Sequence, residues 1–202
     1  MKDFGLLIGR VAAGLLVAGH GAQKLFGWFD GPGLQNWTAV TEQRLGMRPA
    51  KFWAPVGGLG EFAGGLLTAF GLLNPLGPIA MGAMMIAASY KGHWGKPIWA
   101  SKGGAELAVS FLSSAVVAGT HDPGRYALDS ILGIRVPRWM TALALLGSAG
   151  LLAETIRPTL NPRLLGGVSA PQRERTPEQQ MSQTRDARVC PGSGAADTPP
   201  ST

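Results

Sequence analysis

The chain has 202 residues, of which 46% are hydrophobic and 15% charged, with 30 glycines, one cysteine and a formal net charge of +6. A single cysteine excludes a disulfide framework and, because no CxxC pair exists, a self-contained dithiol redox enzyme. The sequence contains no P-loop, no dinucleotide fingerprint following a strand and no histidine pair at metal or haem spacing. We therefore expect no resident metal and no nucleic-acid partner.

Five apolar segments, separated by charged or Pro/Gly-rich connections, occupy the first 156 residues, at about 4–22, 52–73, 76–90, 104–119 and 139–156. A helix needs about 20 apolar residues to cross a bilayer, with about 17 as a lower limit. The third and fourth segments are short, so they also suit the buried helices of a soluble bundle. However, "LLIGRVAAGLLVAG" and "LAVSFLSSAVVAG" lack the charged face that a helix of a soluble bundle presents. We predict an all-α integral membrane protein.

The N-terminal segment also has the outline of a secretory signal peptide, with a lysine, an apolar run and small residues. Asp3 and Arg10 are unusual in a signal, and four more apolar segments follow, so we expect a retained first span. Tryptophan prefers the headgroup level of a membrane. All six tryptophans fall at or between the expected span ends: Trp28, Trp37, Trp53, Trp94, Trp99 and Trp139.

The distribution of Lys and Arg over the short connections predicts an orientation. With five spans, the connections 23–51 and 91–103 and the near tail lie on one side and carry eleven Lys and Arg residues, against four on the other side. This bias places the tail in the cytoplasm and the N-terminus outside. If 139–156 does not span, the count becomes seven against eight and the bias disappears. Residues 157–202 are rich in Pro, Arg, Ser, Thr and Gln, and we predict a disordered basic tail.

Five ionisable residues are expected at one membrane face, because successive helices alternate in direction: His20, Lys24, Glu61, His93 and Glu106. A charge at membrane depth costs roughly 2.5 to 3.5 kcal/mol on insertion scales and usually pairs or lines a wet cavity. We therefore expect Lys24 to cluster with Glu61 and Glu106 in a polar pocket, with the histidines beside it. Alternatively, Lys24 and His93 lie at the interface, and Glu106 faces water near its helix N-terminus.

Arg10 lies inside the first span, away from these residues. It is either an orientation anchor or structural pair, or a functional counter-ion, and the sequence leaves both readings open.

The second span carries glycines at close spacing. Gly60 and Gly64 are four residues apart, and Gly57, Gly58 and Gly65 widen this smooth surface. Small residues at such spacing allow two helix backbones to approach closely. We expect the first span, which is also rich in Gly and Ala, to pack there.

The connection 23–51 has its own pattern. A Gly-Pro-Gly turn is followed by Leu34, Trp37, Thr41 and Leu45 near helical spacing, with polar residues between them. We predict a short interfacial helix in a position to cover the polar cluster.

Several motifs occur in a fixed order along residues 4–130: an arginine in the first span, "HGAQKLFGWFDGPG", "LGEFAGGLLTAFGLLNP", "KGHWG", "GGAELA" and "HDPGRYALD". In this combination the chain resembles the DoxX family of small bacterial membrane proteins. The resemblance implies a four-helix membrane bundle over residues 1–130, so a fifth helix within 131–156 and the tail 157–202 are departures from the family pattern. It also implies a multi-pass protein of the bacterial plasma membrane.

Members of this family are associated with membrane redox chemistry, including quinol oxidase and thiosulfate:quinone oxidoreductase subunits. The resemblance therefore implies a non-autonomous subunit of a quinone- or thiol-linked oxidoreductase system, with soluble or membrane oxidoreductase subunits as partners. Quinone is the candidate cofactor. The other expected partners are the lipid bilayer and further copies of the chain. Two alternatives remain: a scaffold or assembly protein without catalysis, and a small-solute transporter. No residue is assigned a catalytic role.

Overall fold

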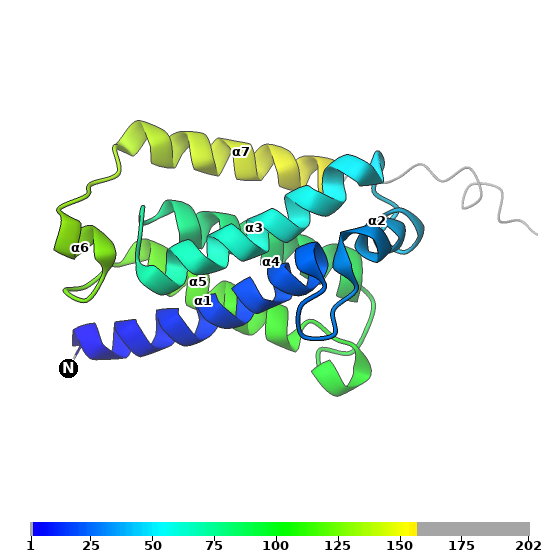
Figure 1. Ribbon diagram of the computed structural model, residues 1–202, viewed down its shortest axis with the longest axis horizontal. Helices are drawn as coiled ribbons and strands as arrows, with labels where there is room; N and C mark the ends of the chain where they lie inside the picture. The colour runs from blue at the N-terminus through cyan, green and yellow to red at the C-terminus, as the bar shows by residue number, and fades with distance from the viewer. Residues whose placement is uncertain (1, 157–202) are drawn as a thin grey trace, which may run out of the picture. The chain divides into compact units, whose positions relative to one another are not determined.

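The computed structural model describes residues 2–156, and every regular element in that range is helical (Figure 1). The elements are α1 (Lys2–Phe26), α2 (Gly33–Gln43), α3 (Ala50–Phe70), α4 (Leu76–His93), the 3-10 helix η1 (Ala100–Lys102), α5 (Glu106–Thr120), α6 (Leu128–Leu132) and α7 (Arg138–Ile156). The expected all-α class is confirmed. The predicted tail, 157–202, lies outside the described residues.

The five apolar segments correspond to α1, α3, α4, α5 and α7, and the predicted interfacial helix corresponds to α2. Local signals explain the turn between α3 and α4. Gly71 adopts the left-handed conformation, with φ of 61°, and its amide closes the last turn of α3, as is usual for glycine at a helix C-terminus. Pro75 then directly precedes α4.

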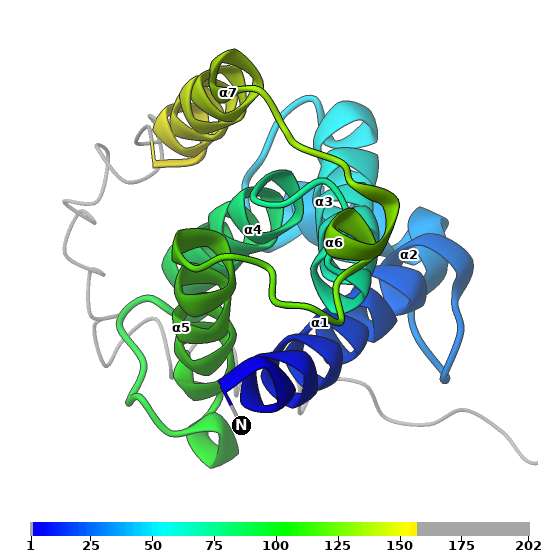
Figure 2. The same ribbon diagram turned by 90° about the vertical axis from the view of Figure 1, so that its left-hand side faces the viewer.

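Helix α4 lies in the middle of the bundle and packs against α3, α5 and α7 (Figure 2). Helix α1 runs along α3 on the other side, and α2 packs against both α1 and α3. Consequently, the end of α1, the start of α3 and the ends of α4 and α7 contribute to one cavity at one end of the bundle.

Glycines bring α1 and α3 into backbone contact. A methyl group on Gly14 would lie 2.6 Å from both the Gly65 carbonyl oxygen and the Ala69 nitrogen, and one on Gly65 would lie 2.6 Å from the Gly14 carbonyl oxygen. Such distances leave no room for any side chain. The expected tight packing of the first two apolar segments is present in the structure.

Only some of the glycines expected at this contact take part in it. Gly60 and Gly64 face α4, where added methyl groups would meet Met84 and Met81, and Gly57 has no neighbour within 4 Å. Gly58 and Gly65, seven residues apart, form the surface toward α1 instead. Seven residues make about two helical turns, so Gly58 and Gly65 lie on the same face of α3. Gly60 and Gly64 lie on another face of α3, which packs against α4.

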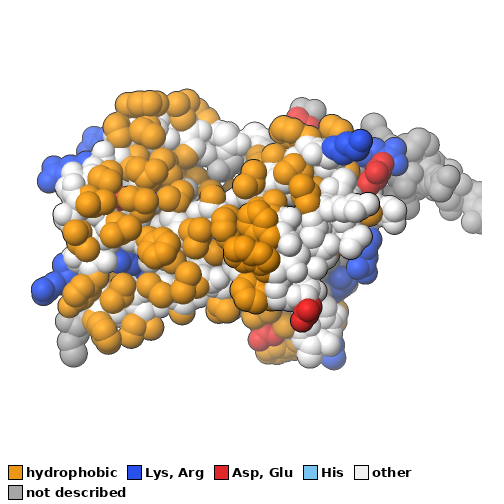
Figure 3. Space-filling view, in the orientation of Figure 1, with side chains coloured by type: hydrophobic (Ala, Val, Ile, Leu, Met, Phe, Trp, Pro, Cys, Tyr) orange, Lys and Arg blue, Asp and Glu red, His pale blue; other side chains and the backbone are white. Residues whose placement is uncertain are grey.

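The interior and exterior of the bundle differ in side-chain size. The buried apolar residues are mainly alanines with a few methionines, led by Met81 and Val17, which are fully buried. Large apolar side chains lie outside instead, including Phe4, Ile8 and Leu16 on α1. Figure 3 shows hydrophobic side chains across one broad face, with charged side chains mainly toward its two ends. Burial of large side chains therefore does not stabilise this fold in the usual way.

Two helices in the described range, α1 and α7, are long and apolar enough to cross a membrane by length and composition, and α5 is apolar but shorter. Helix α1 is partly buried by its neighbours, whereas only 6% of the apolar window of α7 is buried. Helices α3 and α4, with 21 and 18 residues, do not meet this combined criterion of length and composition.

The contact between α1 and α3 predicts different effects for two glycines of the same helix. Gly14→Ala places a methyl group against the backbone of α3, so it should lower the free energy of unfolding by about 1–3 kcal/mol. Gly19→Ala is the matched control, because nothing lies within 4 Å of its added methyl. Thermal denaturation in detergent should show a lower midpoint for Gly14→Ala alone, and equal midpoints would contradict the described contact.

Candidate functional site

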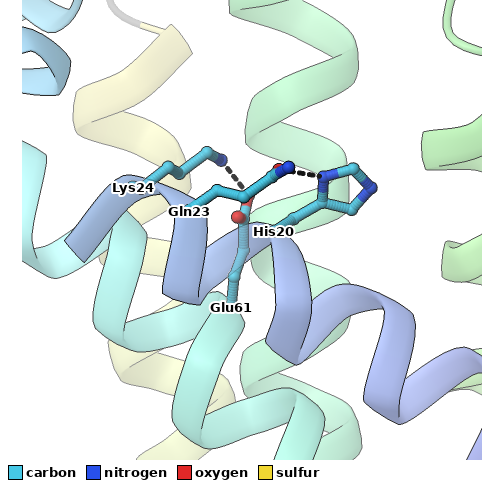
Figure 4. A network of polar contacts seen from close by, with 4 residues as sticks. All are labelled: His20, Gln23, Lys24 and Glu61. Carbon is cyan, nitrogen blue, oxygen red and sulfur yellow. Dashed lines mark hydrogen bonds and ion pairs between the residues drawn. The ribbon is translucent and has the colours of Figure 1, made fainter. Parts of the chain in front are cut away.

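A buried ion pair joins the end of α1 to the middle of α3. The Lys24 ammonium donates a hydrogen bond to Glu61 Oε1 (Figure 4). Glu61 is 4% exposed. Gly58, one turn before Glu61, underlies Leu25, the residue next to Lys24, and has no side chain to hold the helices apart. A buried carboxylate without a counter-charge would carry a large desolvation cost, so Lys24 is the group that allows Glu61 to be charged there.

Helix α2 covers this pair, as its position in the sequence predicted. The Lys24 Nζ lies 4.5 Å from the centre of the Trp37 ring, within the range of a cation–π contact. Thr41, one turn later on α2, is 2% exposed and donates to the Trp37 carbonyl oxygen over 2.8 Å. The ammonium is therefore enclosed between a carboxylate and an aromatic face.

A cavity of about 190 Å³ adjoins the pair. Its polar lining includes Lys24, Glu61, Trp37 and His93, and its apolar lining comes from three helices, for example Val56 of α3, Met84 of α4 and Leu151 of α7. Two polar atoms of these lining residues, Glu61 Oε2 and Trp37 Nε1, are buried without a hydrogen-bond partner. Two of the residues that line the cavity therefore carry a spare acceptor and a spare donor, each costly to leave unsatisfied.

His20 lies beside the ion pair without joining it. Its Nδ1 pairs with Gln23 Oε1 over 3.2 Å, and its ring meets Phe111 of α5 edge-on, with 6.4 Å between the ring centres. Figure 4 shows the His20 ring directed away from Glu61. The one-turn spacing of His20 and Lys24 puts them close in sequence, but His20 turns toward α5 and Lys24 toward α3.

Glu106 does not complete the cluster that the sequence suggested. Its Oε2 accepts a hydrogen bond from the Ala100 amide over 2.8 Å, and its own amide donates to the Ile98 carbonyl oxygen. As the first residue of α5, Glu106 lies next to a connection whose backbone amides need acceptors. It closes the connection that contains η1 instead of pairing with Lys24.

His93 links the cavity to the same connection. Its side chain lines the cavity, and its Nδ1 pairs with the Gly103 carbonyl oxygen over 2.7 Å. The structure therefore places Lys24, Glu61 and His93 around one cavity, while His20 and Glu106 lie outside it.

Arg10 belongs to the opposite end of the bundle. It is 7% exposed and donates to the Pro123 and Tyr126 carbonyl oxygens over 2.6 and 2.7 Å. Asp129 acts electrostatically on it and also accepts the Leu73 and Asn74 amides over 2.8 and 2.7 Å. Arg10 therefore joins α1 to the segment after α5, and Asp129 joins that segment to the turn between α3 and α4. These contacts support the structural reading of Arg10.

Residues 5–94 match the model of the DoxX family. This match supports DoxX family membership. No curated protein and no solved structure matches the chain.

The DoxX match contains every residue that forms the ion pair and its cover, namely Lys24, Trp37, Thr41 and Glu61, as well as Arg10 and His93. It ends with α4, so "GGAELA" and "HDPGRYALD" lie beyond it. Family membership supports a membrane-associated protein. Among the described residues, no group of three or more His, Cys, Asp and Glu side chains could hold a metal ion.

Sequence reasoning missed three contributors. The sequence predicts Trp37 as an interfacial anchor. Its place on the helix predicted to cover the cluster is the feature that could have indicated its contact with Lys24. Asp129 was not singled out, and Thr155 of α7, which is 1% exposed and lines the cavity, carries no local signal at all.

The Lys24–Glu61 ion pair predicts a strong energetic coupling. Lys24→Met leaves the Glu61 carboxylate buried and unpaired, which should cost about 3–5 kcal/mol, whereas the double variant Lys24→Met/Glu61→Leu should recover most of that loss. Unfolding by SDS in mixed micelles measures the stability of Lys24→Met, of Glu61→Leu and of the double variant. The exposed pair Arg48–Glu42, 3.6 Å apart, is the control, because exposed pairs contribute little. Additive effects at Lys24 and Glu61 would exclude the coupling.

The contacts of Arg10 predict a local effect on the segment after α5. Arg10→Met removes both hydrogen bonds to the 123–126 backbone, so amides of residues 124–134 should exchange faster by at least about tenfold, as expected when local opening becomes easier. Arg125→Met is the control in the same segment, because Arg125 is exposed. Hydrogen–deuterium exchange with mass spectrometry measures both variants, and unchanged exchange in Arg10→Met would argue against this anchoring role.

Proposed function

We propose that the protein is a multi-pass protein of the bacterial plasma membrane in which α1, α3, α4, α5 and α7 span the bilayer. The exterior supports this proposal. Large apolar side chains are exposed on four of these helices, for example Leu15, Leu59, Val116 and Leu146. Helix α7 in particular is too little buried for the core helix of a soluble protein. Lipid would cover these surfaces.

The aromatic residues at the ends of the helices support the same proposal. Trp28 and Phe29 follow α1, Trp94 follows α4 and Trp139 begins α7, and all four are exposed. Trp rings favour the headgroup region, where their apolar body and polar N–H are both satisfied. The Lys24–Glu61 cavity would then lie near one interface, on the side predicted to be cytoplasmic.

Within that membrane protein, we propose a role as a non-autonomous subunit of an oxidoreductase system, and we propose that the cavity holds a quinone-like headgroup. The observation that carries this proposal is the pair of unpartnered buried atoms, Glu61 Oε2 and Trp37 Nε1, in residues that line the cavity. The volume of about 190 Å³ is below the roughly 300–1,000 Å³ of sites for drug-sized ligands. It suits a single ring with its chain extending toward lipid.

The donors and acceptors of the cavity match such a headgroup. The Trp37 N–H and the Lys24 ammonium are donors for carbonyl oxygens, and Glu61 Oε2 is an acceptor for a hydroxyl. A bound quinone would supply the acceptor of two electrons, which a partner subunit would deliver. Glu61 would hold or release a proton close to the ring, and Lys24 would set the charge of Glu61.

A scaffold without catalysis is the second candidate, and the completeness of the Lys24–Glu61–Trp37 contact supports it. In that case the ion pair serves only to join α1, α2 and α3. A small-solute transporter has no specific observation in its favour.

The two candidates predict different results for Trp37→Phe, which keeps the ring above Lys24 and removes the N–H donor. Under the quinone proposal, the protein purified in mild detergent should contain bound quinone by extraction and chromatography, and Trp37→Phe should retain about tenfold less. A tenfold change corresponds to about 1.4 kcal/mol, the size of one buried hydrogen bond. Trp94→Phe, at an exposed position after α4, should retain the wild-type amount.

Glu61→Gln completes this experiment. Quinone-dependent activity of the purified complex should be lost while the amount of folded protein is kept. Two results together would favour the scaffold. The wild-type protein would contain no quinone and no co-purifying oxidoreductase subunits, and Glu61→Gln would lower only the amount of folded protein.

A further inference from the structure

A second cavity lies at the Arg10 end of the bundle, between α1 and α5. Its volume is about 580 Å³, within the range of small-molecule sites. Its walls are apolar or small, including Gly5, Leu6 and Gly9 on α1 and Val117 and Ala118 on α5. Charged and polar groups lie at the start of α1 and just after α5, namely Lys2, His121 and Asp122, and Asn74 is added by the turn between α3 and α4. We call this cavity the α1–α5 cleft.

Arg10, one of the residues that line this cleft, has an unused donor. Its side chain is 7% exposed, and its two terminal nitrogens donate to backbone carbonyl oxygens, but its Nε is buried without a partner. The hydroxyls of Ser113 and Ser114, which also line the cleft, donate to carbonyl oxygens of their own helix over 2.9 and 3.0 Å. They are left as acceptors. A ligand therefore gains most by presenting an acceptor to Arg10.

The surroundings of the cleft indicate how a ligand would reach it. Phe4 and Ile8 of α1 and Val116 of α5 are exposed apolar side chains on the helices that form it. In the proposed membrane these faces contact lipid. Lys2 lies at the start of α1, and Asp122 follows α5, so both lie where a headgroup would be. Among the described charged residues of the lining, Lys2 and Asp122 have opposite signs, and the Arg10 charge is offset by Asp129.

We propose that the α1–α5 cleft binds one glycerophospholipid with a zwitterionic headgroup. The phosphate pairs with Lys2 and the ammonium with Asp122. An ester carbonyl accepts from Arg10 Nε, and an acyl chain lies along Gly5 and Gly9. This site is separate from the Lys24–Glu61 cavity and does not depend on quinone binding there.

Two glycines of α1 allow a direct test. Gly9 lines the cleft and has nothing within 4 Å of an added methyl group, so Gly9→Leu introduces a side chain into the cleft from a position with open space. Gly19 has equal space but lines no described cavity, so Gly19→Leu is the matched control. Full-length protein in mild detergent is titrated with phosphatidylethanolamine, and bound lipid is counted by native mass spectrometry. Gly9→Leu should bind at least about tenfold more weakly than the wild type, and Gly19→Leu should bind equally well.

Further ligands and variants separate the parts of the proposal. Lys2→Gln should weaken phosphatidylethanolamine binding several-fold, and phosphatidylglycerol, which lacks the ammonium, should bind several-fold more weakly than phosphatidylethanolamine. Equal binding by the two lipids would overturn the pairing with Asp122. Displacement of the lipid by millimolar inorganic phosphate would identify a site for free phosphate instead. Equal binding by Gly9→Leu and Gly19→Leu, with Gly5→Leu also unaffected, would overturn the site itself.

Discussion

The contact between Lys24 and Glu61 is the interaction on which the arrangement of the first three helices depends. A carboxylate that is almost fully buried in a glycine-rich, apolar helix needs a cation within reach, and the only way for Lys24 to supply it is for the end of α1 to lie against α3. Gly14 and Gly65 permit this approach by leaving the two backbones in contact. The same ammonium then attracts the Trp37 ring, so one ion pair positions α1, α2 and α3 together.

The sequence predicted the helices well, because their signals are local. Apolar runs bounded by charged and Pro/Gly-rich connections define α1, α3, α4, α5 and α7, and the spacing of Leu34, Trp37 and Thr41 predicts α2. It also predicted the pairing of Lys24 with Glu61, because a buried carboxylate and a lysine at the same membrane level leave few other partners. The alternation of helix direction brings residues to one end of a bundle, and this is enough to predict such a pair.

What the sequence could not predict is the direction in which each side chain points about its helix axis. Glu106 lies at the expected end of the bundle, but its carboxylate accepts a hydrogen bond from a backbone amide of the neighbouring connection, which is a closer donor than Lys24. The glycines show the same limit: spacing identifies a smooth surface, but only packing decides that Gly60 faces α4 and Gly65 faces α1. Rotations of about 100° per residue separate these outcomes, and a pattern of small residues does not specify them.

A buried charged side chain lies at each end of the bundle, and Arg10 and Glu61 differ in the partners that stabilise them. At one end, Arg10 donates to two carbonyl oxygens and is favoured electrostatically by Asp129, which in turn binds the turn between α3 and α4. Its charge is used in joining segments. At the other end, Glu61 has one oxygen committed to Lys24 and one without a partner, in a residue that lines a cavity. A group used only to join helices gains nothing from an unsatisfied oxygen, which costs about 1–3 kcal/mol. The same reasoning applies to Arg10 Nε, which is also buried without a partner, so this cost is the physical reason to look for a ligand that donates to Glu61 Oε2 at one end and a ligand that accepts from Arg10 at the other.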